Sequence, residues 1–137
     1  MELVLDANIL MSALVTTNGF TYDLIFNDKI KLFSPEFISE EFEEHREEII
    51  KKSNLANEEI ELFLNLISTR IHFISKEELI PYFQEAEKIS PDKDDSVYFA
   101  LALKLNCPIW SNDKKLKDQN KVNVYPTHEL SELIKRI

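Results

Sequence analysis

The chain alternates short apolar runs with longer segments in which apolar residues recur at helical spacing. Uninterrupted short runs are typical of strands buried on both faces of a parallel sheet. They are "ELVL" (2–5), "IKLFSP" (30–35), "RIHFIS" (70–75), "PIW" (108–110) and "VNVY" (122–125). Helical character marks the segments 7–15, 20–27, 36–52, 57–68, 75–89, 95–105 and 127–137, with a short helical turn at 113–118. The alternation predicts an α/β protein, a three-layer sandwich with a mostly parallel central sheet flanked by helices. The length of 137 residues suits a single domain that spans 1–137.

The acidic segment 36–52 predicts one long amphipathic helix that pairs with the helix at 57–68. Ile38, Phe42, His45 and Ile49 repeat at spacings of four, three and four, which defines the inward stripe. At ~100° per residue, Glu41 lies roughly 70° from the centre of this stripe. The glutamates that fall much further round are Glu40, Glu43, Glu44 and Glu47. Glu41 is therefore the best candidate to point at an edge of the core.

Three further residues predict local backbone features. Gly19, at the end of "TTNG", supplies the turn between the first two helices. Pro81 must lie in the first turn of its helix or kink it. Thr127, with Glu129 and Glu132, is expected to cap the last helix.

Acidic side chains are expected to meet at one edge of the predicted sheet. Asp6 follows "ELVL" and Asp113 follows "PIW", which places both at carboxyl ends of strands, where open parallel sheets bind ligands. Asp94 and Asp95 open the helix that leads into "PIW", and a right-handed connection brings its start to the same edge. Taken singly, each of these could be a cap or turn residue. Together with Glu41 they form a set whose charges repel by several kcal/mol unless something neutralises them.

A divalent cation is the simplest neutralising partner for such a set. The candidate ligands are all oxygen, and no cysteine or histidine cluster accompanies them, because His45, His72 and His128 are scattered. Hard oxygen ligands favour Mg²⁺ or Mn²⁺ over Zn²⁺.

Net charge, cysteine content and the absence of long apolar runs in the sequence limit the possible classes of protein. Sixteen basic and 25 acidic residues give a formal charge of −9, which argues against nucleic-acid binding through a broad basic face. Cys107 is the only cysteine, so no internal disulfide forms, and Trp110 is expected in the core. The opening residues are too few and too acidic for a signal peptide, and no apolar run is long enough to span a membrane, so we expect a cytoplasmic protein.

Four segments, in order, resemble the signatures of PIN-domain proteins, which include the VapC-type toxin ribonucleases of toxin–antitoxin pairs. They are "LDANIL", "SEEFEEH", "PDKDDSVYFALAL" and "IWSNDKKL", and they span nearly the whole chain. Carried over position by position, the acidic quartet of the family falls on Asp6, Glu41, Asp95 and Asp113. Glu40 and Glu44 remain alternatives to Glu41, and one departure is Ala7, where the family often carries Thr or Ser.

The resemblance implies a PIN-like fold and a ribonuclease in which the quartet holds one or two Mg²⁺ or Mn²⁺ ions. It implies that Asn8 and Ser111 support the site, and Asp94 is expected beside Asp95 as a cap or a supporting residue. Lys114, Lys115 and Lys117, next to Asp113, are candidates for steering an RNA substrate. The acidic hairpin at 36–68 is a candidate surface for an antitoxin or for a homodimer.

Other functions stay open at this point. The chain could be a catalytically idle PIN-like domain that binds RNA or protein, or an RNA-processing nuclease that is not a toxin. A phosphatase with Asp6 as nucleophile would need a second aspartate two positions on, where this chain has Asn8.

Overall fold

A computed structural model describes residues 1–15 and 19–137, in which five strands alternate with helices. The strands are β1 (Glu2–Leu5), β2 (Lys31–Pro35), β3 (Ile71–Ile74), β4 (Ile109–Trp110) and β5 (Val124–Tyr125). The helices are α1 (Ala7–Val15), α2 (Phe20–Ile25), α3 (Ile38–Glu44), α4 (Arg46–Ser53), α5 (Asn57–Ser68), α6 (Lys76–Ile89), α7 (Ser96–Leu105) and α8 (Thr127–Lys135), with 3₁₀ turns η1 (Lys93–Asp95) and η2 (Lys114–Lys117). None of the helices in these described ranges is long and apolar enough to cross a bilayer.

The strands form one sheet in the order β3-β2-β1-β4-β5, and every neighbouring pair is parallel. β1 lies in the centre, between β2 and β4, with Val4 opposite both Phe33 and Ile109. The carboxyl ends of β1 and β4 are therefore neighbours at one edge. This arrangement sets Asp6 and the residues after Trp110 side by side, as the sequence predicts.

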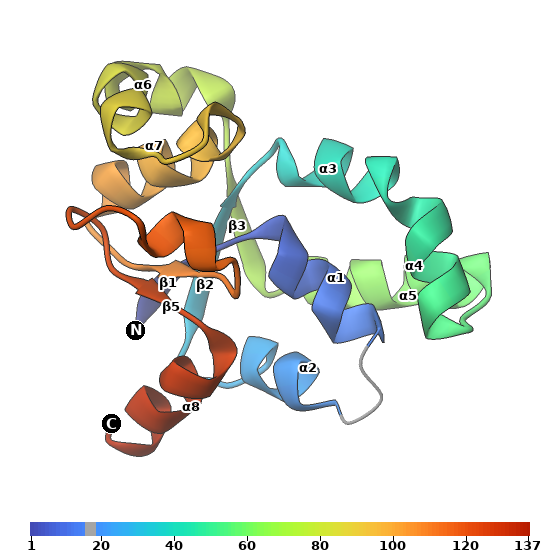
Figure 1. Ribbon diagram of the computed structural model, residues 1–137. Coiled ribbons are helices and arrows are strands. Elements are labelled where there is room, and N and C mark those ends of the chain that lie inside the picture. The colour runs from blue at the N-terminus through green and yellow to red at the C-terminus, as the bar shows by residue number, and fades with distance from the viewer. Residues whose placement is uncertain (16–18) are drawn as a thin grey trace.

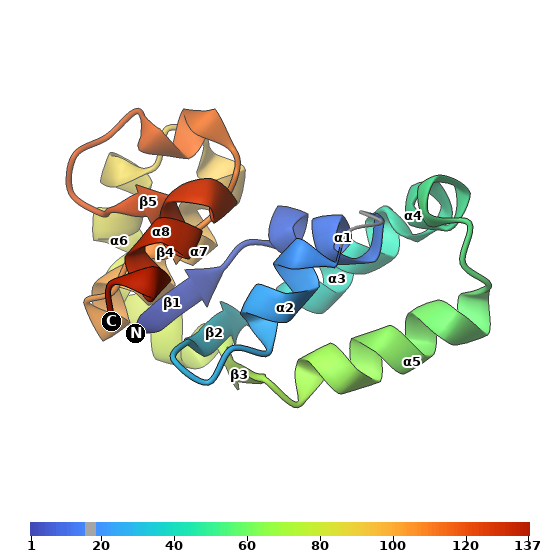
Figure 2. The same ribbon diagram turned by 90° about the horizontal axis from the view of Figure 1, so that it is seen from below.

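The sheet is covered on both faces, which makes three layers (Figures 1 and 2). Successive residues of a strand point to opposite faces, so Leu3 and Leu5 join one apolar cluster while Val4 joins the other. The first cluster draws on α1 to α5 and α8, and the second on α6 and α7. The α/β sandwich predicted from the sequence is confirmed. Trp110 is fully buried, as expected.

The prediction of one helix over 36–52 is wrong, because the chain breaks at His45 between α3 and α4. His45 has φ −108° and ψ 7°, outside helical geometry. Ile38, Phe42 and Ile49 are buried as the stripe predicts. The His45 side chain is 46% exposed, and its Nδ1 lies 3.6 Å from Glu48 Oε2. The imidazole of His45 is polar, so contact with the Glu48 carboxylate and with solvent stabilises it more than burial in the core would.

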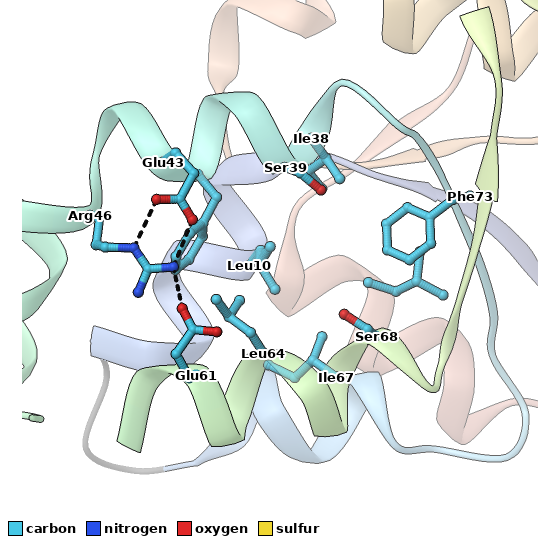
Figure 3. A pocket seen from close by; sticks show the side chains of 12 residues that line it. Leu10, Ile38, Ser39, Glu43, Arg46, Glu61, Leu64, Ile67, Ser68 and Phe73 are labelled. Atoms are coloured by element: carbon cyan, nitrogen blue, oxygen red, sulfur yellow. Dashed lines mark hydrogen bonds and ion pairs between the residues drawn. The ribbon is translucent and has the colours of Figure 1, made fainter. Parts of the chain in front are cut away.

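The break lets Arg46 link three helices (Figure 3). Its guanidinium donates to Glu43 on α3 and to Asn57 and Glu61 on α5, at 2.6–2.9 Å. The link closes one end of an apolar pocket of about 170 Å³ between α3 and α5, with Phe73 at the other end. The network therefore holds the three helices of the acidic hairpin to one another.

Local caps differ from those expected. Asp94 was expected as a cap, but the capping side chain at η1 is that of Asp92. Its Oδ1 accepts a hydrogen bond from the backbone N–H of Asp94. The first N–H of α8 is capped by Asn112 Oδ1 at 2.8 Å, while Thr127 Oγ1 accepts from the indole of Trp110.

Pro81 lies inside α6, beyond the first turn. Gly19 has the positive φ expected of it, and the preceding residues 16–18 of "TTNG" lie outside the described residues.

Candidate functional site

A buried carboxylate, Asp6, stands at the carboxyl end of the central strand and is 3% exposed. Its Oδ2 accepts a 2.6 Å hydrogen bond from Ser111 Oγ, and its Oδ1 accepts from the backbone N–H of Asn8 at 3.4 Å. Ser111 Oγ in turn accepts from the N–H of Asp113 at 3.1 Å. Ser111 therefore ties Asp113, which follows β4, to Asp6, which follows β1.

Glu41 reaches the same place from α3. It is partly buried, whereas Glu40 and Glu44 are exposed, as the helical geometry predicts. Burial, followed by the charges of Asp6 and Asp95, raises the pKa of Glu41 to about 7 against the lowering influence of the Tyr98 hydroxyl. A carboxyl group in this state is half protonated near neutral pH.

Asp95 completes the group at the start of α7. Burial raises its pKa to about 6, with further contributions from the charge of Asp6 and, among others, Asp113. Burial also raises the pKa of Asp6, to which the charge of Asp113 adds. Asp6 is thus close enough to each of the other three for their charges to act on one another. Four segments far apart in sequence bring their carboxylates to one place.

Tyr98 belongs to this group and was not foreseen from the sequence. It is fully buried on α7, three residues after Asp95 and so on the same side of the helix. Burial, followed by the charge of Glu41, raises the pKa of Tyr98, yet its hydroxyl completes no hydrogen bond with any of the described residues. The spacing from Asp95 was the available signal, but an aromatic residue in an apolar run is ordinarily assigned to the core.

The donor set suits a hard divalent cation, because it consists of carboxylates that disfavour one another's ionised form. As the side chains stand, no group of three or more His, Cys, Asp or Glu within residues 1–15 and 19–137 is arranged to hold a metal ion. The four carboxylates therefore lie near one another, but their oxygens do not yet point to a common position that a metal ion could occupy. Side-chain rotation of the partly exposed Glu41, Asp95 and Asp113 toward the fixed Asp6 would be needed to close a coordination shell.

The other residues singled out in the sequence lie around this group. Asn8 reaches Asp6 through its backbone N–H, while its side chain is exposed. Asp94 is exposed beside Asp95, and Lys114 and Lys115 are exposed on η2. Lys117 Nζ is 3.0 Å from Glu129 Oε1 on α8, so part of its charge is already matched. Of the three lysines, Lys114 and Lys115 are the better placed to meet a ligand.

The raised carboxyl pKa values predict that the metal-free protein loses stability as the pH rises. Glu41 and Asp95 hold protons in the folded state at pH values where the unfolded chain, with ordinary pKa values of 4.5 and 3.8, has released them. The free energy of unfolding must then fall from about pH 4 and level off above about pH 7. One pKa unit is worth about 1.4 kcal/mol. Both groups are partly exposed, so we expect a total loss of about 2 kcal/mol.

Urea unfolding in EDTA at a series of pH values measures this loss. Glu43 and Glu48 have lowered pKa values, and their opposite contributions are complete once the pH has passed their unfolded pKa of 4.5, so the fall is measured from about pH 5 upward. The Glu41→Gln variant should lose much of the slope, while Glu40→Gln, an exposed neighbour, should keep it. A free energy of unfolding that rises from pH 5 to pH 8 contradicts the prediction.

Comparison with known proteins identifies the family. The family model described as PIN domain matches residues 4–128 of this chain. The chain belongs to the PIN domain family. Among solved structures, a chain of VapBC2 from Rickettsia felis, in a crystal structure with a DNA fragment from their promoter, matches with a TM-score of 0.67. The match covers 92% of this chain and 98% of that one at 17% identity, which shows a shared fold. No curated protein matches this chain.

The expected PIN-like fold is therefore confirmed. The four carboxylates lie within the matched range of the PIN domain, at the carboxyl edge of the parallel sheet. Ligands of open parallel sheets bind outside this edge.

Proposed function

We propose that this protein is an endoribonuclease that depends on Mg²⁺ or Mn²⁺. The observation that carries the proposal is the convergence of Glu41, Asp95 and Asp113 on the buried Asp6. Beside burial, the charge of Asp6 raises the pKa of Glu41 and of Asp95, and the charge of Asp113 raises the pKa of Asp6. A purely structural site gains nothing from this clustering, since each added charge destabilises the fold. Membership of the PIN domain family supports a nuclease in particular.

Asp6, Glu41, Asp95 and Asp113 would hold the ion or ions. A bound divalent cation neutralises charge that develops on the phosphoryl oxygens when water attacks the phosphodiester. Asp6 is the fixed member, because Ser111 Oγ and the Asn8 N–H orient it. Asp113 is oriented through the same Ser111 and through the N–H of Lys115 to its Oδ1 at 3.0 Å.

Two exposed lysines stand next to the proposed site in a chain that is otherwise strongly acidic. The chain carries a formal charge of −9, which repels a polyanion at long range. Lys114 and Lys115 follow Asp113 directly and are exposed. We assign to them the task of guiding the RNA backbone toward the loaded site, with Lys117 contributing less because Glu129 pairs with it.

A toxin of a toxin–antitoxin pair is the biological role that we favour. The VapBC2 complex is a structural relative of this chain. An antitoxin protein is accordingly the partner that we propose, and the acidic hairpin of α3 to α5 is the surface that we assign to it or to a second copy of the chain. The same chemistry would serve an RNA-processing enzyme that is not a toxin.

Metal removal tests the proposed activity. Incubated with a mixed RNA pool, the protein should cut in Mn²⁺ or Mg²⁺, stop cutting in excess EDTA and resume when Mn²⁺ is added back. A preparation of the Asp118→Asn variant, changed at an exposed aspartate after η2, should behave as the wild type. Cutting that persists unchanged in EDTA contradicts a metal-dependent mechanism. A complete lack of cutting at any ion concentration favours the idle domain that binds RNA or protein.

A further inference from the structure

A second hollow lies at the same edge of the sheet as the carboxylates. It is a cavity of about 460 Å³ between the start of α3, the inner side of α6 and the turn that opens α7. Figure 1 shows α3 on one side of β3 and the α6–α7 pair on the other. Its walls share backbone with the candidate site, since Glu40 precedes Glu41, and Asp94 and Ser96 flank Asp95. The volume lies within the range of small-molecule pockets, about 300–1,000 Å³.

The wall of this cavity contains a polar group that lacks a partner. Ser96 is 4% exposed, and its Oγ has no hydrogen-bond partner among the described residues. Buried hydroxyls are almost always hydrogen-bonded, so an orphan in a cavity wall calls for an explanation. Because the Oγ is itself buried, the side chain must rotate toward the cavity before a ligand atom can supply the missing bond.

The walls select a flat, uncharged ligand rather than a phosphate. Phe37 is 38% exposed and Phe83 is half-buried, and both present aromatic surface on which a base can stack. Four carboxylates and two ammonium groups line the cavity, so its net charge is negative and repels an anion. Carboxylates accept hydrogen bonds, and they favour a ligand that offers N–H donors.

We propose that this cavity is a nucleobase subsite, which takes the guanine of a nucleotide next to the scissile phosphate. The proposal rests on the proposed ribonuclease function, whose carboxylates adjoin the cavity. Guanine alone among the four bases offers a carboxylate two adjacent donors, N1–H and the N2 amino group. Glu40 or Asp94 accepts them, the ring stacks on Phe37, and O6 accepts from the Ser96 hydroxyl.

Two measurements on the whole chain test this subsite. The first is binding of free guanosine, followed by NMR through the backbone amides of residues 37, 40 and 96, with adenosine, cytidine and uridine for comparison. Guanosine should shift these amides at lower concentration than the other three nucleosides. The second is the sequence around each cut in a random RNA pool, where guanine should be enriched at one flanking position by about fivefold or more.

The variants separate this role from folding. Phe37→Ala alters an exposed ring, so the fold should persist while guanosine binding and the guanine enrichment fall toward the level of the other bases. Ser96→Ala should weaken both to a smaller extent. Phe73→Ala is the matched control, because Phe73 is similarly exposed but lines the pocket between α3 and α5. In Phe73→Ala, guanosine binding and the guanine enrichment should both stay as in the wild type.

The outcomes distinguish this proposal from the proposed function. RNA cutting without base preference, together with no guanosine shifts at the cavity, overturns the subsite and leaves the nuclease in place. Guanosine shifts at the cavity without any RNA cutting support a guanine site and count against the nuclease. Guanosine shifts that survive Phe37→Ala, or that fall on other residues, overturn the subsite.

Discussion

The Asp6→Asn variant should lose RNA cutting by on the order of 10³-fold while it folds as well as the wild type or better. The loss follows from the position of Asp6, which is the most buried of the four carboxylates and accepts hydrogen bonds from Ser111 Oγ and from the Asn8 N–H. An amide binds a divalent cation far less strongly than a carboxylate. Its oxygen still accepts the bond from Ser111, and removal of a buried charge relieves repulsion.

The measurement pairs cutting rates in Mn²⁺ with urea unfolding in EDTA at pH 8. Asp95→Asn should show the same pairing of lost activity and retained stability. Asp118→Asn controls for a change of net charge, because it removes an exposed carboxylate outside the site. An Asp6→Asn protein that is stable and cuts at more than a tenth of the wild-type rate excludes Asp6 from the proposed role.

The Trp110→Ala variant should lose about 3–5 kcal/mol of unfolding free energy, the largest stability effect of a single substitution that we expect. Trp110 is fully buried in β4, and its indole N–H donates to Thr127 Oγ1 at 3.1 Å. Its carbonyl accepts from the N–H of Asp6 at 3.3 Å. Truncation leaves a cavity between the sheet and α8, next to Ser111, which directly follows β4. Small domains have only about 5–15 kcal/mol in total, so the variant should be largely unfolded in mild urea.

Trp110→Phe is the informative companion, because it keeps most of the ring and removes the bond to Thr127. We expect a loss of about 1–2 kcal/mol from it in urea unfolding. An alanine variant that loses less than about 1 kcal/mol contradicts the packing described for β4.

The sequence predicts the sandwich because its signals are local and agree with one another. Short apolar runs alternate with helical periodicity, and that alternation leaves few arrangements other than a parallel sheet covered on both faces. The meeting of Asp6, Asp95 and Asp113 follows from the same logic, since carboxyl ends and helix starts share one edge. The placement of Glu41 follows from the periodicity of a single helix.

The features that the sequence does not predict depend on contacts between distant segments. The break at His45 accompanies Arg46, whose partners Asn57 and Glu61 lie on another helix. The cap of α8 comes from Asn112, at the end of a different strand. Tyr98 was overlooked because its hydroxyl matters only where α3 brings Glu41 against it. Local patterns carry no information on such pairings.

Calorimetric titration of Mn²⁺ into the metal-free protein at pH 8 tests the central claim, that these carboxylates hold a divalent cation. The account predicts saturable binding to the wild type and to Asp118→Asn, and loss of that binding in Asp6→Asn. Loss should be partial in Glu41→Gln, because the buried Asp6 and its hydrogen bonds remain. Equal binding by the wild type and Asp6→Asn, or no binding by either, would contradict the account.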